Sequence, residues 1–141
     1  MKIIVDTNVL LDVVLKRKPF EDDSLIVVEA CQQELVLGAV TTQTIADMFY
    51  LLRKHLTVEE RKTLLLWYCD IFYIAPIDED KVVSALNNND FTDFEDCLQA
   101  ECAITFEADY IVTRNTKHFF HSHVPAITPI EFRAKLSVEG E

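Results

Sequence analysis

Glycine and proline are scarce in this chain: two of its 141 residues are glycine and four are proline. This content excludes a disordered or low-complexity chain, because such chains are enriched in these residues. No apolar run reaches the length of a membrane-spanning helix, and the first apolar segment is too short for a signal peptide. The sequence therefore predicts a soluble, cytoplasmic protein with no membrane partner.

Cysteine pairs and nucleotide-binding patterns are absent as well. The four cysteines, Cys31, Cys69, Cys97 and Cys102, stand at wide spacings without a CxxC pair, so we expect reduced thiols rather than a zinc site. The sequence contains no GxxxxGK(S/T), GxGxxG or GxSxG pattern. These absences argue against a P-loop, a Rossmann cofactor site and a serine hydrolase.

Positive charge is in deficit, because 13 lysines and arginines stand against 24 aspartates and glutamates, for a formal net charge of −11. This balance argues against a protein that holds nucleic acid through a broad basic face. It is compatible with an enzyme whose acidic centre is neutralised by metal ions. Half of the residues are apolar, which is ample for a core, and the length predicts one domain spanning residues 1–141.

Apolar spacing alternates between strand-like and helical along the chain. The short apolar runs predict strands at 3–5, 39–42, 73–77, 110–113 and 124–127. Helical spacing fills the segments between them, and capping-box patterns open two of the helices at Thr57 and Thr128. This order predicts the α/β class: a three-layer sandwich with a mainly parallel central sheet.

One glycine predicts where the second helix ends. Gly38 is expected to end a helix over 22–37 whose inward side carries Leu25, Val28 and Leu35.

The sequence also predicts which aromatic side chains are buried and one ion pair within a helix. Trp67 and Tyr68, in a leucine-rich helix, are expected to pack in the core, and the alternatives are stacking on bases or an apolar surface for a dimer or a partner peptide. Phe119 and Phe120 are expected in the core too. Lys16 has the i, i+4 spacing for an ion pair with Asp12.

Asp6 directly follows the first apolar strand. A carboxylate at the end of a buried strand must be satisfied or used, because an unpaired buried charge is costly. One alternative is hydrogen bonding to nearby backbone N–H groups or to Asn8. The other is a functional site, since ligands of parallel sheets bind beyond the carboxyl ends of the strands.

Further acids lie near the starts of two predicted helices. Asp93 and Asp96 are three residues apart and share a helix face, whereas Glu95 points roughly away from Asp93. Asp47 lies in the second turn of the helix that follows the strand at 39–42. Each acid has a structural alternative: a helix N-cap for Asp93 and Asp96, and a place on a solvated rim for Asp47.

Together these acids indicate one chemistry. Carboxylates that converge at a sheet edge repel one another, and a hard divalent cation such as Mg²⁺ or Mn²⁺ relieves that repulsion. Such a centre activates water for attack on a phosphodiester.

The ordered segments VDTNVLLD, TTQTIADM, DFEDCLQAECA and ADYIVTRNTKHF, with the closing TPIEF, resemble the PIN-domain family nearly end to end. The resemblance is closest to the VapC-type toxin nucleases of bacteria and archaea. It implies a metal-dependent endoribonuclease that uses Mg²⁺ or Mn²⁺ and acts as the toxin of a toxin–antitoxin pair. The implied partners are an RNA substrate, a small antitoxin protein and a second copy of the chain in a homodimer.

By position, the resemblance assigns metal binding and catalysis to Asp6, Asp47 and Asp96, with Asp93 close by. Asn115 matches the fourth catalytic position, which is Asp in some members and Asn in others.

The resemblance also assigns supporting roles around these acids. Thr7 and Thr113 would be supporting groups, and Arg114 and Lys117 are the best candidates for RNA contacts because they adjoin the expected site.

The chain departs from the family pattern at three positions. Asp47 stands where Glu is more usual, Asn115 carries no charge, and His118 stands where many relatives have Asp. These departures and the negative charge support a second hypothesis: a catalytically weak or inactive PIN-like module that binds RNA or a protein. A third hypothesis, a phosphoryl-receiving regulator that uses Asp6, would need further acids and a late-strand lysine that we cannot place.

Overall fold

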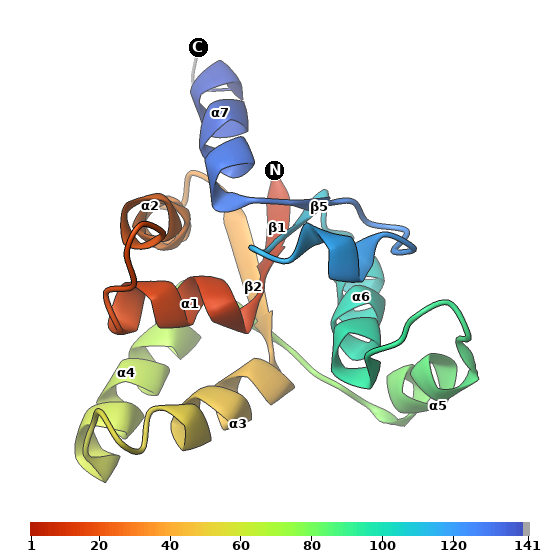
Figure 1. The fold of residues 1–141 in the computed structure, drawn as a ribbon, viewed down its shortest axis with the longest axis horizontal. Coiled ribbons are helices and arrows are strands. Elements are labelled where there is room, and N and C mark those ends of the chain that lie inside the picture. Colours follow the sequence, from red (N-terminus) through yellow and green to blue (C-terminus); the bar gives the residue numbers. More distant parts are fainter. Residues whose placement is uncertain (140–141) are drawn as a thin grey trace.

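A computed structural model describes residues 1–139; Gly140 and Glu141, which belong to the predicted domain, lie outside the described residues. Within the described range, five strands form one sheet in the order β3-β2-β1-β4-β5, and every neighbouring pair is parallel. The strands are β1 (Lys2–Val5), β2 (Leu37–Thr41), β3 (Tyr73–Ala75), β4 (Tyr110–Val112) and β5 (Ala126–Ile127). The predicted parallel sheet is confirmed (Figure 1).

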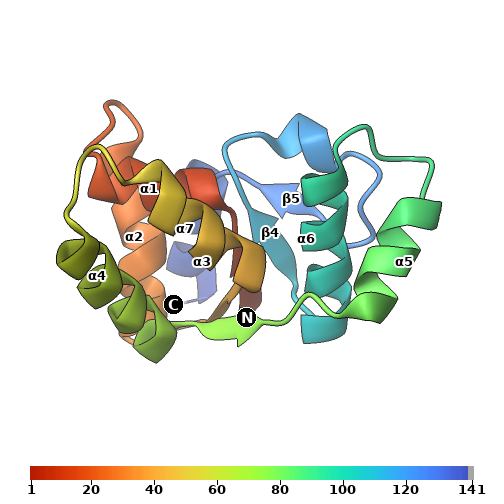
Figure 2. The same cartoon turned by 90° about the horizontal axis from the view of Figure 1, so that it is seen from below.

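Helices cover both faces of this sheet. They are α1 (Thr7–Val14), α2 (Glu21–Gln32), α3 (Thr42–Leu51), α4 (Val58–Ile71), α5 (Glu79–Asn87), α6 (Phe94–Phe106), α7 (Pro129–Glu139) and the 3-10 helix η1 (Thr116–Phe119). Helices α5 and α6 lie together on one side, and α1 to α4 lie on the other (Figure 2). The three-layer α/β architecture is therefore confirmed. Over residues 1–139, no helix is long and apolar enough to cross a membrane.

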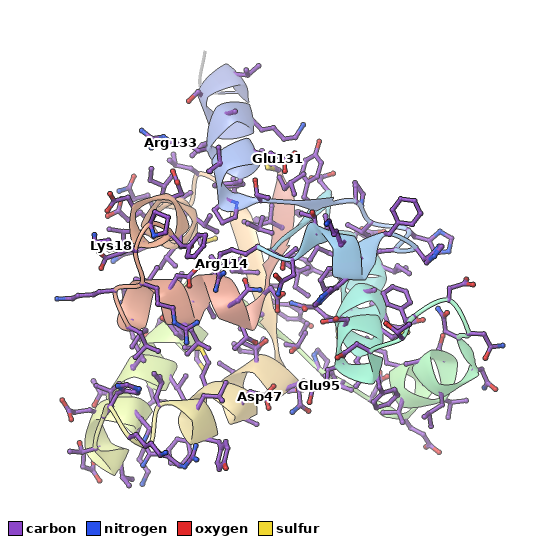
Figure 3. The ribbon with its side chains drawn as sticks, viewed as in Figure 1. Lys18, Asp47, Glu95, Arg114, Glu131 and Arg133 are labelled. Carbon is purple, nitrogen blue, oxygen red and sulfur yellow. The ribbon has the colours of Figure 1, made fainter. Side chains whose placement is uncertain are left out.

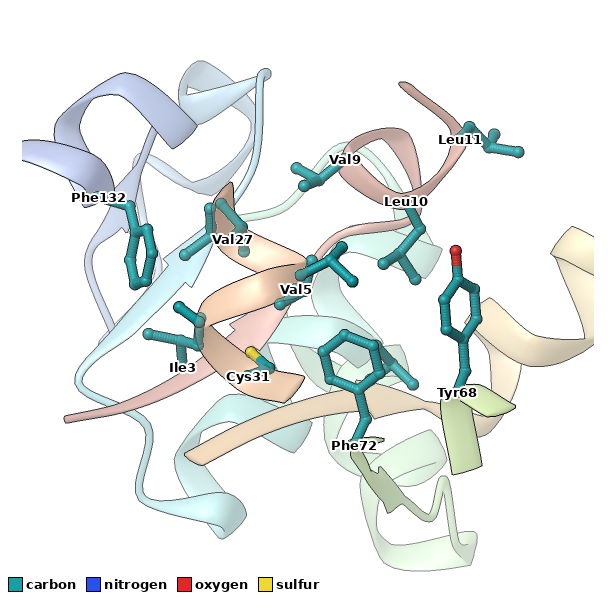
Figure 4. Packing of buried hydrophobic residues seen from close by; sticks show 14 of the residues in the cluster. Ile3, Val5, Val9, Leu10, Leu11, Val27, Cys31, Tyr68, Phe72 and Phe132 are labelled. Atoms are coloured by element: carbon teal, nitrogen blue, oxygen red, sulfur yellow. The ribbon is translucent and has the colours of Figure 1, made fainter. Parts of the chain in front are cut away.

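Alternation along β1 divides the core between the two faces. Ile3 and Val5 pack in a large cluster with α1, α2, α4 and α7, whereas Ile4 packs in a smaller one with α6. Figure 4 shows the large cluster, in which Cys31 of α2 lies among the same apolar side chains as Phe72. All three β1 side chains are fully buried, and burial of each such side chain contributes roughly 1.5–3 kcal/mol.

Both predicted capping boxes are present. The Thr57 hydroxyl accepts a hydrogen bond from the backbone N–H of Glu60, whose carboxylate accepts one from the N–H of Thr57. Thr128 and Glu131 make the same reciprocal pair at the start of α7.

The expectation for neighbouring aromatic residues was half wrong. Tyr68 and Phe119 are buried as predicted, but Trp67 and Phe120 are exposed. Side chains of consecutive residues on a helix point in directions about 100° apart, so only one of two neighbours faces the sheet.

The predicted helix over 22–37 was wrong at its C-terminal end. Helix α2 stops at Gln32, Glu34 takes a left-handed backbone with φ 59°, and Leu35 is exposed. Leu25 is also partly exposed, so of the three expected inward residues only Val28 is buried. Gly38 lies inside β2, opposite Ile3. Pairing with β1 therefore overrides the local signal that placed Gly38 at a helix end.

Gly38 is required for a different reason, which yields a stability prediction. A Cβ atom at this position would clash with Cys31 Sγ and lie 3.1 Å from Phe72 Cδ1. We expect Gly38→Ala to lower the free energy of unfolding by about 1–3 kcal/mol in urea titrations. In a Cys31→Ala background the same substitution should be less damaging. An equal loss in both backgrounds would show that the clash with the sulfur is not the cause.

Candidate active site

The strand order reverses direction at β1, which lies between β2 and β4. Three polar residues gather at the carboxyl ends of these strands: Asp6 follows β1, Thr41 ends β2 and Thr113 follows β4. The Asp6 backbone N–H donates to the Val112 carbonyl at 2.9 Å, which continues the pairing of β1 with β4. In parallel α/β sheets, ligands bind at such a reversal of strand order.

The Asp6 carboxylate lies at this edge of the sheet, and both of its oxygens accept hydrogen bonds. Its Oδ1 accepts from the backbone N–H of Thr7 at 2.8 Å, which caps α1. Its Oδ2 accepts from the Thr113 hydroxyl at 2.7 Å and from Asn8 Nδ2 at 3.2 Å. Burial raises the pKa of the Asp6 carboxyl above its ordinary value, and the hydrogen bonds from the Thr113 hydroxyl and the Thr7 backbone act against the rise. Thr113, which the resemblance names as a supporting group, thus donates directly to the Asp6 carboxylate.

Four carboxylates line one cleft of about 40 Å³ at this edge: Asp6, Asp47, Glu95 and Asp96. The Asp47 side chain, on α3, accepts from Gln43 Nε2 at 2.8 Å. Figure 3 shows Asp47 and Glu95 in the space between α3 and α6. The structure therefore brings together three of the predicted acids and adds a fourth.

Glu95 is the acid that our sequence reasoning missed. We expected it to point away from the site because it is offset from Asp93 on a helical wheel. The structure instead lets its side chain reach the cleft between α6 and α3. Its adjacency to Asp96 was the available signal, but the position of α3 could not be read from this segment.

Burial and mutual repulsion shape the protonation of these groups. Burial, followed by repulsion from Asp93 and Asp6, raises the pKa of Asp96 to about 6. Burial, followed by repulsion from Asp47 and Asp93, raises the pKa of Glu95. The cleft therefore disfavours negative charge in the absence of a cation.

Asp93 and Asn115 are placed differently from the other predicted site residues. Asp93 is exposed and caps α6, because its Oδ1 accepts from the Asp96 backbone N–H at 2.9 Å. Asn115 is exposed, and its backbone N–H donates to the Thr113 hydroxyl at 3.0 Å. Neither residue lines the cleft. Lys117 is exposed in η1, and the Thr7 hydroxyl lies 3.0 Å from the Thr44 hydroxyl.

His118 contacts one of the acids directly. Its Nδ1 lies 3.2 Å from Asp96 Oδ2, and its side chain is largely exposed. A protonated imidazole there partly neutralises Asp96, which is a role that a metal ion would otherwise take.

Arg114 is committed to an internal ion pair. Its Nε lies 2.6 Å from Oδ2 of Asp12, a residue with no exposed surface, and its guanidinium stacks 4.1 Å above the Phe20 ring. Ser24 also donates to Asp12, at 3.2 Å. Asp12 thus pairs with Arg114, and more loosely with Arg17 at 3.8 Å, rather than with Lys16 as the i, i+4 spacing suggested.

The cleft suits a hard divalent cation by the chemistry of its donors. Its acidic groups present only carboxylate oxygens, the ligands that Mg²⁺ and Mn²⁺ prefer. Repulsion among these groups is what a cation would relieve. Over residues 1–139, however, no three His, Cys, Asp or Glu side chains are close enough to hold one ion together. An ion held in this cleft would therefore require Asp47 or Asp96 to move closer to Asp6.

Comparison of the sequence with family models identifies the class. The model for the PIN domain matches residues 2–117, so the chain belongs to the PIN-domain family. PIN domains are generally nucleases and typically use divalent metal ions. No curated protein matches the chain in sequence.

Solved structures share the fold at low sequence identity. A chain of VapBC2 from Rickettsia felis, bound to a DNA fragment from its promoter, is 17% identical with a TM-score of 0.67, and the match covers 91% of this chain and 98% of that one. A chain of FitAcB from Neisseria gonorrhoeae is 20% identical with a TM-score of 0.64, covering 91% and 98%. A chain of FitAB bound to the IR36 DNA fragment is 20% identical with a TM-score of 0.63, covering 90% and 94%.

The buried ion pair of Asp12 and Arg114 yields a stability prediction. Arg114→Met leaves a fully buried carboxylate without its main partner, so we expect the free energy of unfolding to fall by about 3 kcal/mol in urea titrations. Lys117→Met, three residues further along on an exposed position, is the matched control and should change it by less than about 0.5 kcal/mol. Similar values for the two variants would refute a structural role for Arg114.

The raised pKa of Asp96 predicts a pH-dependent stability. The folded state holds this proton more tightly than the unfolded state, so the stabilising contribution is full at low pH and is lost as the pH rises through about 6. Asp96→Asn removes the ionisation. In EDTA, we expect this variant to gain about 1–2 kcal/mol over the wild type at about pH 8, and little at about pH 4.5.

The control for this experiment is Asp70→Asn, which changes an exposed acid on α4. It should show no such pH-dependent gain. A gain for Asp96→Asn of the same size at both pH values would mean that ionisation of Asp96 does not destabilise the fold.

Proposed function

We propose that this chain is an endoribonuclease that hydrolyses RNA phosphodiester bonds with Mg²⁺ or Mn²⁺ as cofactor. The observation that carries the proposal is the cleft at the reversal of strand order, where Asp6, Asp47, Glu95 and Asp96 lie together. Membership of the PIN-domain family supports a nuclease. The raised pKa values of Asp96 and Glu95 support a site whose carboxylates would be stabilised in the ionised form by a bound cation.

We assign each acid of the cleft a separate role. Asp6, Asp47 and Asp96 would hold the ion, with Glu95 as a further acid of the same cleft. When bound, the ion supplies positive charge that neutralises the carboxylates and the charge developing on the phosphate. Thr113 and the N-terminus of α1 hold the Asp6 carboxylate in one orientation, so it needs no rearrangement on binding. Asp93 would act indirectly, by capping the helix that carries Asp96.

Asn115 and the basic residues are assigned weaker roles. Asn115 lies next to the cleft rather than in it, so its contribution would come through the Thr113 hydroxyl or through contact with RNA. Lys117 is free to meet a phosphate, being exposed beside the site. Arg114 would serve mainly to fix the segment that carries Thr113.

We further propose that the nuclease is the toxin of a toxin–antitoxin pair and forms a homodimer. The structural neighbours VapBC2 and FitAB are complexes with an antitoxin, which supports a protein partner of this kind. This chain carries an open apolar groove of about 650 Å³ between α1 and α4, lined by Val13, Leu64, Trp67 and other residues. We assign this groove to the antitoxin, because an amphipathic segment would bury its apolar surface there.

One observation favours the second candidate, a PIN-like module that binds RNA or protein without cutting. His118 pairs with Asp96, one of the carboxylates proposed to hold the ion, and no three ligands of residues 1–139 are preassembled. A module of this kind would bind RNA without a metal requirement.

Cleavage of RNA by the purified protein distinguishes the two candidates. We expect the wild type to cut a single-stranded RNA pool with Mg²⁺ or Mn²⁺ and not with EDTA, and to leave single-stranded DNA of the same sequences intact. Asp6→Asn and Asp96→Asn should each lower the rate by at least about 100-fold, because each removes a charge from the ion's ligands. Asp70→Asn, purified identically, should cut like the wild type.

The same proteins report on metal binding without any cleavage. Mn²⁺ should raise the melting temperature of the wild type and of Asp70→Asn, since a ligand that binds only the folded state stabilises it. The shift should be absent in Asp6→Asn. No cutting and no metal-dependent shift in the wild type would favour the binding module, whereas equal cutting by all proteins would reveal a contaminating nuclease.

A further inference from the structure

A second cavity opens at the same edge of the sheet as the acidic cleft. This α2–α7 cavity has a volume of about 280 Å³, and its walls include Pro19, Phe20, Asp23, Arg114, Thr128 and Ile130. Arg114 comes after β4 and Thr128 after β5, and these strands are parallel, so the cavity lies beyond their carboxyl ends. Arg114 also directly follows Thr113, whose hydroxyl donates to Asp6. An RNA strand whose phosphate lies in the cleft is therefore within reach of this cavity.

Apolar side chains form two walls of the α2–α7 cavity. Phe20, just before α2, and Ile130, in the first turn of α7, keep 41% and 66% of their surfaces exposed. Exposed aromatic and aliphatic surfaces of this kind pack against the faces of unstacked bases. Pockets for small molecules begin at roughly 300 Å³, so this cavity has room for one ring system rather than for an extended ligand.

Arg114 brings hydrogen-bond donors to the cavity. Over residues 1–139 its side chain donates only through Nε, to Oδ2 of Asp12, whose Oδ1 accepts no hydrogen bond. The two Nη atoms therefore remain open to a ligand, and the side chain is 25% exposed. The ion pair with Asp12 and the stacking on Phe20 hold the guanidinium in one orientation. A fixed guanidinium can donate to two neighbouring acceptors at once.

Asp23 supplies acceptors to the same cavity from the first turn of α2. Within the described part of the chain, its ion pair with Arg133 is long, at 3.4 Å, and uses Oδ1. A carboxylate has about four acceptor positions, so Asp23 can still accept hydrogen bonds from a ligand. The cavity thus combines apolar walls, the donors of Arg114 and the acceptors of Asp23.

We propose that the α2–α7 cavity binds a guanine base of the RNA substrate, from a nucleotide near the cleaved bond. This inference rests on the proposed ribonuclease function. Guanine has two adjacent donors, N1–H and the N2 amino group, that suit Asp23, and two acceptors, O6 and N7, that suit Arg114. Adenine and cytosine place a ring-nitrogen lone pair beside their amino group, which a carboxylate repels. Uracil has a single N–H donor on its base-pairing edge.

Sequencing the ends produced from a random single-stranded RNA pool with Mn²⁺ tests this inference. We expect guanine at one fixed position relative to the cut, preferred over adenine by roughly 10-fold, because one good base contact discriminates by about that factor. Asp23→Asn should reduce the preference to about twofold or less, because it replaces a charged acceptor by an amide. Asp22→Asn is the matched control, since Asp22 lies in the same helical turn but does not line the cavity, and it should keep the wild-type preference.

Binding of a mononucleotide tests the cavity without any cleavage. In EDTA, GMP should shift the backbone amide NMR signals of Phe20 and Ile130 at roughly 10-fold lower concentration than AMP. The difference between GMP and AMP should vanish in Asp23→Asn and persist in Asp22→Asn. Arg114 is left unchanged in these experiments, because its ion pair with Asp12 also supports the fold.

Several outcomes would overturn the inference. Cleavage without a guanine preference, or with one that persists in Asp23→Asn, would refute it while leaving the ribonuclease proposal intact. Absence of cleavage by the wild type would count against the proposed function, and the GMP titration would then decide for the cavity alone. Shifts specific to GMP would support guanine binding, whereas equal shifts with AMP, or none with either nucleotide, would refute it.

Discussion

The hydrogen bond from the Thr113 hydroxyl to Asp6 is the interaction on which the rest of the site depends. It joins two residues that are 107 positions apart and closes the carboxyl ends of β1 and β4 around one carboxylate. Without such donors, an ionised group at the end of a buried strand would be strongly unfavourable. Asp6 is therefore a structural cap of α1 and a candidate metal ligand at once.

The position of Thr113 is fixed in turn by the contacts of its neighbour Arg114. Arg114, the next residue, is tied to the buried Asp12 of α1, and its backbone N–H donates to the Asn8 side chain at 3.3 Å. This arrangement anchors the segment after β4 to the helix that begins at Asp6. A charged residue that looks like an RNA contact in the sequence thus becomes part of the scaffold that aims the carboxylate.

The acids of the cleft lower the stability of the metal-free fold and are the same groups that the proposed function requires. Asp96 and Glu95 are held where burial and their neighbours disfavour ionisation. Each of these arrangements weakens the metal-free protein. Both arrangements are explained if a cation completes the site, since its positive charge would relieve the repulsion among the carboxylates.

The amino-acid sequence by itself determined the class of fold and most of its elements. The short apolar run Ile3–Val5 and the capping boxes at Thr57 and Thr128 are local signals, and they hold in the structure. The ordered acidic segments were equally readable, because each follows a strand or opens a helix.

Tertiary structure alone decided the end of α2, the reach of Glu95 and the partner of Asp12. Gly38 joins β2 because β1 offers it a neighbour, and Glu95 reaches the cleft because α3 lies across from α6. Asp12 forms its ion pair with Arg114, 102 positions away, rather than with Lys16, four positions away. These outcomes depend on which strands lie side by side, and a local pattern carries no information about contacts made across the sheet.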